Sequence, residues 1–218
     1  MIQEQFSFLY QKNEDKIYEA LKDASTLHDL SNKKYGEFNY IVHLVSVLDI
    51  TTKYGSFIAQ TEEQLVALCV AACFHDVIED TPYSLDELRT YLTDKQFGEN
   101  VTNMVCEIVD ALTTRGTTRK ERHSPAYYER IRSVWGASFV KMADRLANMK
   151  MSYLFNHSLL KMYQKEADIF KINDNFVICV FRFIRNNYFT RFIGYIAFVF
   201  ESNHYFFIRF SCFWMHHI

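Results

Sequence analysis

The chain has 218 residues, 49% of them hydrophobic, which is long enough for one domain with a substantial core and room for an appendage. Its formal net charge of −2 gives no sign of a nucleic-acid-binding protein, and residues 1–16 lack the basic segment and long apolar run of a signal peptide. The five cysteines include no Cys-x-x-Cys pair, so a zinc ribbon or a thioredoxin motif is not expected. Cys69 and Cys73, one helical turn apart, are expected to be reduced core residues, and these features together favour the cytoplasm.

Apolar residues recur at helical spacing along most of the chain, and with only 6 glycines and 2 prolines this predicts an all-α fold. The first helix is expected over residues 15–30, and a polar loop follows over residues 31–39. Further helices are expected over residues 40–54, 61–79, 84–92, 99–112, 120–133, 139–154 and 159–170. Thr61 with Gln64, and Ser84 with Glu87, have the spacing of N-terminal helix caps, and Pro82 is expected to end the helix that begins at Thr61.

Four ionisable residues stand at the end of the otherwise apolar helix 61–79. His75 and Asp76 are adjacent, and Glu79 and Asp80 follow one turn later. Residues i and i+4 share a face of a continuous helix, so we expect His75 to stack over Glu79 and Asp76 over Asp80. Desolvating such groups is costly unless they are paired, and a divalent metal with a phosphate-bearing substrate would pair them.

A second His-Asp doublet, His28-Asp29, provides an internal comparison. No acidic pair follows it at one turn, and the residues around it are polar. We therefore expect this doublet to be an exposed helix end without a functional role.

His43 and Asp144 extend the group of candidate metal ligands. Together with His75 and Asp76 they would supply two nitrogens and at least two oxygens, and would leave positions for water and substrate, as a catalytic metal requires. Mixed imidazole and carboxylate donors suit Mn, Fe and similar ions better than Ca or Mg, which prefer oxygen ligands. Taken singly, His43 could instead be a hydrogen-bonded core histidine, and Asp144 the ion-pair partner of a neighbouring basic residue.

The composition changes at about residue 170. Residues 171–218 hold 11 of the 20 phenylalanines and carry 5 Lys and Arg against 2 Asp and Glu, whereas residues 1–170 carry 19 against 24. The longest apolar run of this tail, residues 192–200, is far shorter than the roughly 20 residues of a membrane-spanning helix. The tail could be an amphipathic segment for a membrane surface or a partner, or translated out-of-frame sequence; we favour the second and assign it no chemistry.

Four stretches carry a family resemblance: GEFNYIVHL (residues 36–44), FHDVIEDT (74–81), VKMADRLANMK (140–150) and RKERHSPAYYERIR (119–132). The first three resemble the metal-ligand segments of the HD-domain phosphohydrolases, and within them the hydrolase domain of the RelA/SpoT guanosine-tetraphosphate enzymes. The fourth looks like the basic helix of short bacterial relatives. The resemblance implies an HD-type helical bundle with a buried metal site over residues 1–170, followed by the atypical tail, residues 171–218. No synthetase domain follows, so a small, hydrolase-only relative is expected.

The resemblance also implies an activity, the hydrolysis of guanosine 3′,5′-bis(diphosphate) to GDP and pyrophosphate with Mn²⁺ or another divalent metal. His43, His75, Asp76 and Asp144 would be the metal ligands. Glu79 and Asp80 would hold or deprotonate the attacking water, and because adjacent carboxylates resist ionising together, one of them is expected to have a raised pKa.

The residues implied to bind substrate are Lys33, Lys34, Lys141, Arg145, Asn148, Arg119, Lys120 and Arg122. The two lysines of the polar loop would contact the nucleotide, and the other basic residues would hold phosphates unless they are ordinary solvated surface residues. Asn148 would bond the ribose or orient a neighbouring side chain.

Two departures from the family's pattern weaken the implied preference for guanine more than the implied hydrolysis. The family's basic-Lys-Ser-Gly loop is KKYG here, residues 33–36, and lysine lacks the planar group with which arginine stacks on a base. Residues 38–39 also stand where proline usually precedes the tyrosine of the first segment, with one extra residue before His43.

Three alternatives remain open from the sequence. The chain could be an HD-domain nucleotidase that acts on another nucleotide, or an inactive HD protein that binds nucleotide as a sensor. A membrane-associated helical interaction protein is a third alternative, which depends on the tail alone. We expect a small nucleotide as the partner, and neither nucleic acid nor a membrane.

Overall fold

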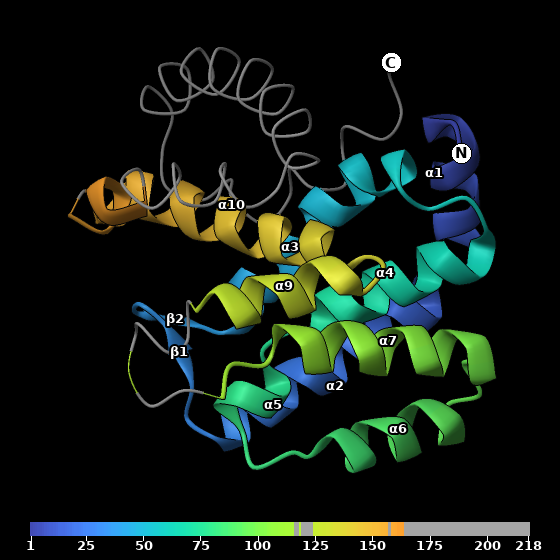
Figure 1. Cartoon of the computed structure of the whole chain (residues 1–218), viewed down its shortest axis with the longest axis horizontal. Helices are drawn as coiled ribbons and strands as arrows, with labels where there is room; N and C mark the ends of the chain where they lie inside the picture. Colours follow the sequence, from blue (N-terminus) through green and yellow to red (C-terminus); the bar gives the residue numbers. More distant parts are fainter. Residues whose placement is uncertain (116–117, 119–123, 157, 164–218) are drawn as a thin grey trace. The chain divides into compact units, whose positions relative to one another are not determined.

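The computed structural model describes residues 1–115, 118, 124–156 and 158–163. Its helices are α1 (Gln3–Lys12), α2 (Glu14–Leu30), α3 (Ile41–Tyr54), the 3-10 helix η1 (Gly55–Phe57), α4 (Glu62–Phe74), α5 (Val77–Asp80), α6 (Leu85–Asp94), α7 (Glu99–Leu112), α9 (Pro125–Ser133) and α10 (Ala137–Phe155) (Figure 1). Strands β1 (Lys34–Tyr35) and β2 (Phe38–Asn39) pair antiparallel as a short hairpin. The predicted all-α fold is thus confirmed. Among the described residues, no helix is long and apolar enough to cross a membrane.

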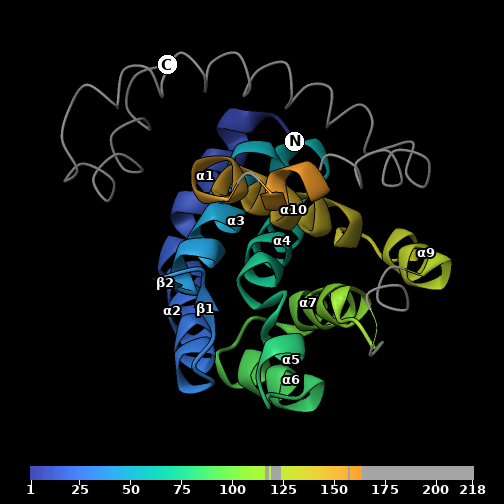
Figure 2. The ribbon, with the colours of Figure 1, turned by 90° about the vertical axis from the view of Figure 1, so that its left-hand side faces the viewer.

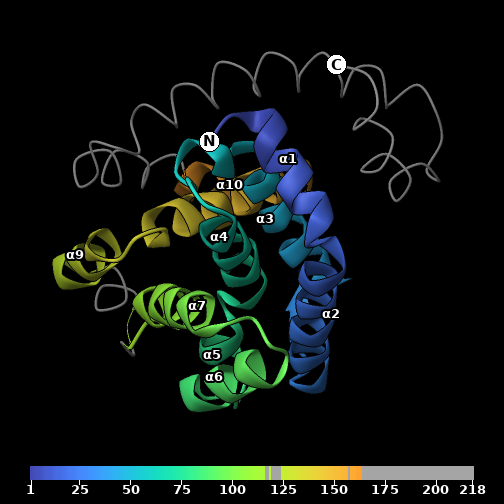
Figure 3. The same cartoon turned by 90° about the vertical axis from the view of Figure 1, so that its right-hand side faces the viewer.

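Helix α4 forms the centre of the bundle. Residues 65–74 of this helix are all buried, because apolar or small side chains occupy every face of it. Figures 2 and 3 show α4 running through the middle, with α2 on one side and α7 on the other. The cysteines Cys69, Cys73 and Cys106 are buried free thiols, as expected for the first two.

A layer of small and branched apolar residues joins α3, α4 and α10 next to the candidate site. Its members are Val47, Ile50, Ala72, Ala143 and Ala147. Alanines at a helix contact allow the helix axes to approach closely, because the distance between axes depends on the side chains between them. His43 lies one turn before this layer on α3, His75 three residues after its α4 member, and Asp144 within its α10 part. The packing of three apolar helices therefore brings three polar side chains to one place.

Helix α1 is absent from the sequence prediction. Phe6 is its only buried residue, so no apolar stripe marks the helix in the sequence. The Phe6 ring packs against the backbone of Gly55, where an added Cβ would lie 2.8 Å from Phe6 Cζ. This close contact with a glycine elsewhere in the chain helps to anchor α1, together with hydrogen bonds of Gln3 to Thr52 and Ser56.

The expected continuous helix over residues 61–79 is wrong. Helix α4 ends at Phe74, a turn follows at His75 and Asp76, and α5 begins at Val77. The Nδ1–H of His75 donates to the Ala72 carbonyl at 2.9 Å, in the region where α4 loses its helical partners. His75 is buried whereas Glu79 is exposed, so the expected stacking of His75 over Glu79 does not occur.

Most other predicted helix boundaries are confirmed within a few residues, and one differs. Thr61 caps α4 by accepting from the Gln64 N–H, and Ser84 and Glu87 form the expected reciprocal cap of α6. Helix α9 begins at Pro125 after a Ser124 cap, later than the start expected at residue 120. Residues 158–163 are helical, while the rest of the last predicted helix, the tail and the boundary at residue 170 lie outside the described residues.

Gly136 fixes the start of the helix that carries Asp144. Its φ of +79° is left-handed, and an added Cβ would lie 2.9 Å from Ile108 Cδ1 and 3.3 Å from Leu68 Cδ1. We therefore expect Gly136→Ala to lower the free energy of unfolding by about 2–4 kcal/mol through backbone strain and overpacking, as measured by urea denaturation. Ile108→Val removes the nearest clashing atom, so it should cost less in the Gly136→Ala background than in the wild type. Equal costs in both backgrounds would contradict the steric explanation.

Candidate metal centre

Four side chains from three parts of the chain meet at one point. His43 comes from α3, His75 and Asp76 from the turn after α4, and Asp144 from α10. The two Nε2 atoms of the histidines are 3.2 Å apart, His75 Nε2 lies 2.9 Å from Asp76 Oδ2, and His43 Nε2 lies 3.3 Å from Asp144 Oδ1. One ligand atom from each residue lies within 4.8 Å of all the others, and no other such group occurs in the described part of the chain. These four residues are called the metal cluster below.

The ring of His75 is held with Nε2 facing the cluster. A carbonyl oxygen can only accept, so the bond between His75 Nδ1 and the Ala72 carbonyl requires the proton on Nδ1. In the neutral ring, Nε2 is then the unprotonated nitrogen that can coordinate a metal. The same backbone contact that accompanies the end of α4 therefore sets the histidine in a ligating orientation.

The cluster carries opposing charges in a buried place. Burial opposes protonation of His75, but the carboxylates of Asp76 and Asp144 outweigh it and raise the pKa of His75 to about 10. Burial also opposes ionisation of Asp144, yet the Lys141 ammonium and the two histidines hold the pKa of this carboxyl well below its usual range. The pKa of Asp76 is likewise lowered, against the effect of burial, by His75 and His43. The buried carboxylate of Asp144 and the partly exposed one of Asp76 thus require positive charge beside them, which a divalent cation would supply.

The donor set of the metal cluster fits a divalent ion of the Mn, Fe or Zn type. Two imidazole nitrogens and two carboxylate oxygens face one another at 2.9–3.8 Å. Bonds of about 2.0–2.2 Å to one central ion place neighbouring ligand atoms at such separations. Mixed nitrogen and oxygen donors also disfavour Ca and Mg, which prefer oxygen ligands.

Helix α5 carries the two acidic residues that were expected to act on water. Lys33 forms an ion pair with Asp80, and Glu79 Oε2 accepts a hydrogen bond from the Thr114 backbone N–H at 3.2 Å. Burial and the nearby Asp76 carboxylate raise the pKa of Asp80, while Lys33 opposes the rise. One member of the acidic pair therefore has the raised pKa that the sequence suggested.

Three residues expected to bind substrate contact carboxylates of the site. Lys33 pairs with Asp80, Lys141 Nζ lies 2.9 Å from Asp144 Oδ2, and Asn148 Nδ2 donates to Asp144 Oδ1 at 2.6 Å. Lys141 is largely buried, and Asp144 raises its pKa although burial opposes this. All three side chains thus contact acidic groups of the site, and both roles expected for Asn148, bonding the ribose or orienting a neighbour, stay predictions.

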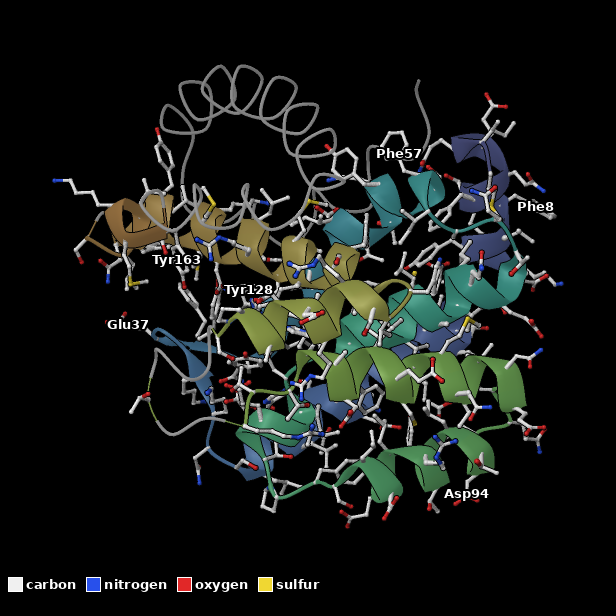
Figure 4. All side chains as sticks on the ribbon, viewed as in Figure 1. Phe8, Glu37, Phe57, Asp94, Tyr128 and Tyr163 are labelled. Atoms are coloured by element: carbon white, nitrogen blue, oxygen red, sulfur yellow. The ribbon has the colours of Figure 1, made fainter. Side chains whose placement is uncertain are left out.

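The remaining expected substrate-binding residues lie away from the metal cluster or outside the described part. Lys34 Nζ donates to Asn39 Oδ1 at 2.6 Å across the hairpin. Arg145 Nη2 donates to the Tyr163 carbonyl at 3.0 Å, and its guanidinium stands over the Tyr163 ring, beside α10 in Figure 4. Arg119, Lys120 and Arg122 are not among the described residues.

Two tyrosines near the metal cluster were missed in the sequence, and the histidine that packs on one of them was expected to be exposed. Tyr40 donates its hydroxyl to Asp76, Tyr35 donates to Asn148, and His28 packs against Tyr40 with ring centroids 4.1 Å apart. His28 is fully buried, so the expectation of an exposed helix end at His28-Asp29 is wrong for the histidine. Its polar sequence neighbours are misleading because the end of α2 packs against α3 and α5. The one available signal was the position of Tyr40 within the GEFNYIVHL segment.

Comparisons with known proteins identify the family. The chain is 31% identical over 138 residues to guanosine-3′,5′-bis(diphosphate) 3′-pyrophosphohydrolase MESH1 of Xenopus tropicalis, covering 62% of this chain and 68% of the relative. The chain belongs to the guanosine-3′,5′-bis(diphosphate) 3′-pyrophosphohydrolase family. Within this family it is also 30% identical over 135 residues to human MESH1, with the same coverage of both chains.

A bacterial member of the family matches a longer part of this chain. The guanosine-3′,5′-bis(diphosphate) 3′-pyrophosphohydrolase of Aquifex aeolicus is 25% identical over 162 residues, which is 72% of this chain and 21% of that protein. No family model and no solved structure matches the chain. The family resemblance inferred from the motifs is thus confirmed by relatives.

Proposed function

We propose that this protein hydrolyses guanosine 3′,5′-bis(diphosphate) to GDP and pyrophosphate with a divalent metal, and that this metal is Mn²⁺. The observation that carries the proposal is the buried metal cluster with Glu79 and Asp80 beside it, in a chain of this family. His43, His75, Asp76 and Asp144 would hold the metal. The choice of Mn²⁺ is supported by the mixed nitrogen and oxygen donors.

The residues of the site divide the work of hydrolysis. When bound, a divalent ion supplies Lewis acidity toward phosphate oxygens and makes water a stronger nucleophile near neutral pH. Glu79, exposed on α5, takes the proton of the attacking water as general base, while its Oε2 stays bound to the Thr114 N–H. Asp80 has a raised pKa and can hold the same proton in turn. Its ion pair with Lys33 keeps the Asp80 carboxylate in place.

The residues proposed to bind the nucleotide contact other protein groups in the structure. Lys34 is exposed on the hairpin and would exchange its bond to Asn39 for the nucleotide. Lys33, Lys141 and Asn148 keep the site's carboxylates oriented and reach the substrate only where a phosphate or ribose oxygen approaches them. Arg145, Arg119, Lys120 and Arg122 remain proposed phosphate contacts on the grounds of charge alone.

The first test is pyrophosphate release from guanosine 3′,5′-bis(diphosphate) by the full chain with added Mn²⁺. Wild type and Asp76→Ala are compared with and without the metal. Release that requires both Mn²⁺ and Asp76 supports the proposal. Metal binding without release would instead indicate another nucleotide substrate or a nucleotide-binding role.

Metal binding is expected to release protons. The carboxylates of Asp76 and Asp144 outweigh burial and raise the pKa of His75 to about 10, so at lower pH the ring carries a proton that must leave before Nε2 can coordinate a metal. Protons compete with the metal below this pKa, so affinity should rise with pH, by about tenfold per unit for each proton released. Calorimetric Mn²⁺ titrations in buffers of different ionisation enthalpy measure the number of protons. A count of zero at pH 7.5 would contradict the expectation.

We also propose a reducing compartment, the cytoplasm, for this protein. Cys69, Cys73 and Cys106 are free thiols, and burial raises the pKa of Cys73 and Cys106 above the ordinary value. Core thiols of this kind need no disulfide partner.

A further inference from the structure

Two tyrosines that have no part in the proposed hydrolysis pack against His43. Tyr35 lies on strand β1, and Tyr40 immediately precedes α3. The ring centroids of Tyr35 and His43 are 4.7 Å apart, and those of Tyr40 and His43 are 5.2 Å apart. The imidazole of His43 is therefore in contact with two aromatic rings.

The two histidines of the metal cluster are oriented by different means. His75 is fixed by its hydrogen bond to the Ala72 carbonyl. Nδ1 of His43 is buried and has no hydrogen-bond partner among the residues that the structure describes. A metal-ligating histidine is usually oriented by a bond from its second nitrogen. For His43, the rings of Tyr35 and Tyr40 and the ring of His75 pack against the imidazole, and its Nε2 faces the Asp144 carboxylate. The two tyrosine rings therefore help to fix the plane of the His43 ring.

The hydroxyls of the same tyrosines reach both carboxylates of the cluster. Tyr40 Oη donates to Asp76 Oδ2 at 2.5 Å. Tyr35 Oη lies 2.9 Å from Asn148 Oδ1, its nearer acceptor, and 3.3 Å from the Ala147 carbonyl oxygen, and Asn148 Nδ2 in turn donates to Asp144 Oδ1 at 2.6 Å. Each tyrosine thus contacts a histidine through its ring and orients a carboxylate through its hydroxyl, Tyr40 directly and Tyr35 through one amide.

The Tyr40 ring is also held in place by neighbours other than His43. It is 6% exposed, its ring packs on the buried His28 at 4.1 Å, and Lys33 Nζ stands 5.8 Å from the ring centroid. A ring with such neighbours has little freedom to rotate, so its hydroxyl keeps a fixed position relative to Asp76.

We propose that Tyr35 and Tyr40 are positioning residues that preorganise the metal cluster, by fixing the ring of His43 and the carboxylates of Asp76 and Asp144. The proposal rests on the proposed function only in that a divalent ion binds at this cluster. It does not depend on which nucleotide is hydrolysed. Outer contacts of this kind typically contribute 10–100-fold to metal affinity or activity.

The test is a calorimetric Mn²⁺ titration of the full chain and its variants at one pH. Tyr40→Phe removes one hydroxyl and keeps the ring, and it should weaken Mn²⁺ binding about tenfold or more. Tyr35→Phe should have a smaller effect because its hydroxyl acts through Asn148, and Tyr35→Ser a larger one because the ring is lost as well. Tyr91→Phe is the matched control, since the hydroxyl of Tyr91 on α6 donates at 2.9 Å to a carboxylate outside the metal cluster, that of Asp23 on α2.

A kinetic measurement separates positioning from substrate contact. Loss of preorganisation in Tyr40→Phe should lower kcat at limiting Mn²⁺ and leave KM for the nucleotide unchanged. Excess Mn²⁺ should then restore much of the rate. It could not restore the rate of a misfolded variant. A rise in KM alone would make these tyrosines substrate contacts and overturn the proposal. Unchanged Mn²⁺ affinity in Tyr40→Phe and Tyr35→Ser, with binding intact in the wild type, would overturn it while leaving the proposed hydrolysis standing. Absence of Mn²⁺ binding in the wild type would overturn both.

Discussion

Replacing Asp144 with asparagine is expected to abolish metal binding at micromolar concentrations and to lower pyrophosphate release on the order of a thousandfold. The substitution keeps the size of the side chain and an oxygen that can accept from Lys141, but it removes the negative charge that faces His43 Nε2 at 3.3 Å. A catalytic metal contributes several kcal/mol to lowering the barrier, and about 1.4 kcal/mol corresponds to a tenfold change in rate. Mn²⁺ titration and a pyrophosphate-release assay measure the two losses.

A matched control exists on α3. Asp49 also binds a lysine, with Lys53 Nζ 2.7 Å from its carboxylate, but it takes no part in the metal cluster. Asp49→Asn therefore makes the same chemical change to an Asp–Lys pair, and it should leave metal affinity and turnover at wild-type values. Wild-type metal content together with full turnover in Asp144→Asn would remove Asp144 from the ligand set.

The metal cluster could be predicted from the sequence because its chemistry conflicts with its surroundings. Buried polar residues are costly, so a His-Asp doublet at the end of an apolar helix indicates a compensating partner. The same reasoning failed for His28, where the neighbours in sequence are polar but tertiary packing buries the ring. Sequence neighbours report the environment of a residue only when the helix that carries them is itself buried, as α4 is.

The partners of the basic residues could not be predicted in the same way. The sequence places Lys33 and Lys141 near the site, but which anion each one meets depends on how the hairpin and α10 pack. Lys141 is three residues from Asp144 on one helix, so that pair was an open alternative, whereas Lys33 and Asp80 are 47 residues apart. The break in the helix after Phe74 was not predicted either. It is accompanied by a local hydrogen bond, from the His75 side chain to a carbonyl of the last turn of α4, which apolar periodicity does not reveal.

Consequently, the roles of Glu79 and Asp80 cannot be assigned from helical spacing. The turn at His75 and Asp76 turns Glu79 outward, where the side chain is exposed, while Asp80 stays half-buried and pairs with Lys33. Glu79 is the better candidate for contact with water and substrate because its side chain is exposed. Measuring Mn²⁺ affinity and turnover together in a Glu79 variant therefore separates metal binding from catalysis.

Glu79→Gln is expected to keep Mn²⁺ affinity within about twofold of wild type and to lower pyrophosphate release by about 10²–10⁴-fold, the usual contribution of a general base. Glutamine retains an oxygen for the Thr114 N–H, so the backbone at Thr114 should keep its position, but the amide cannot accept the proton of a water. Glu63→Gln is the matched control, because Glu63 is also exposed and accepts a hydrogen bond, from Asn100 Nδ2 at 3.2 Å. Unchanged turnover in Glu79→Gln would transfer the role of general base to Asp80. Asp80→Asn would then be the deciding variant, with Mn²⁺ affinity and rate measured in the same way.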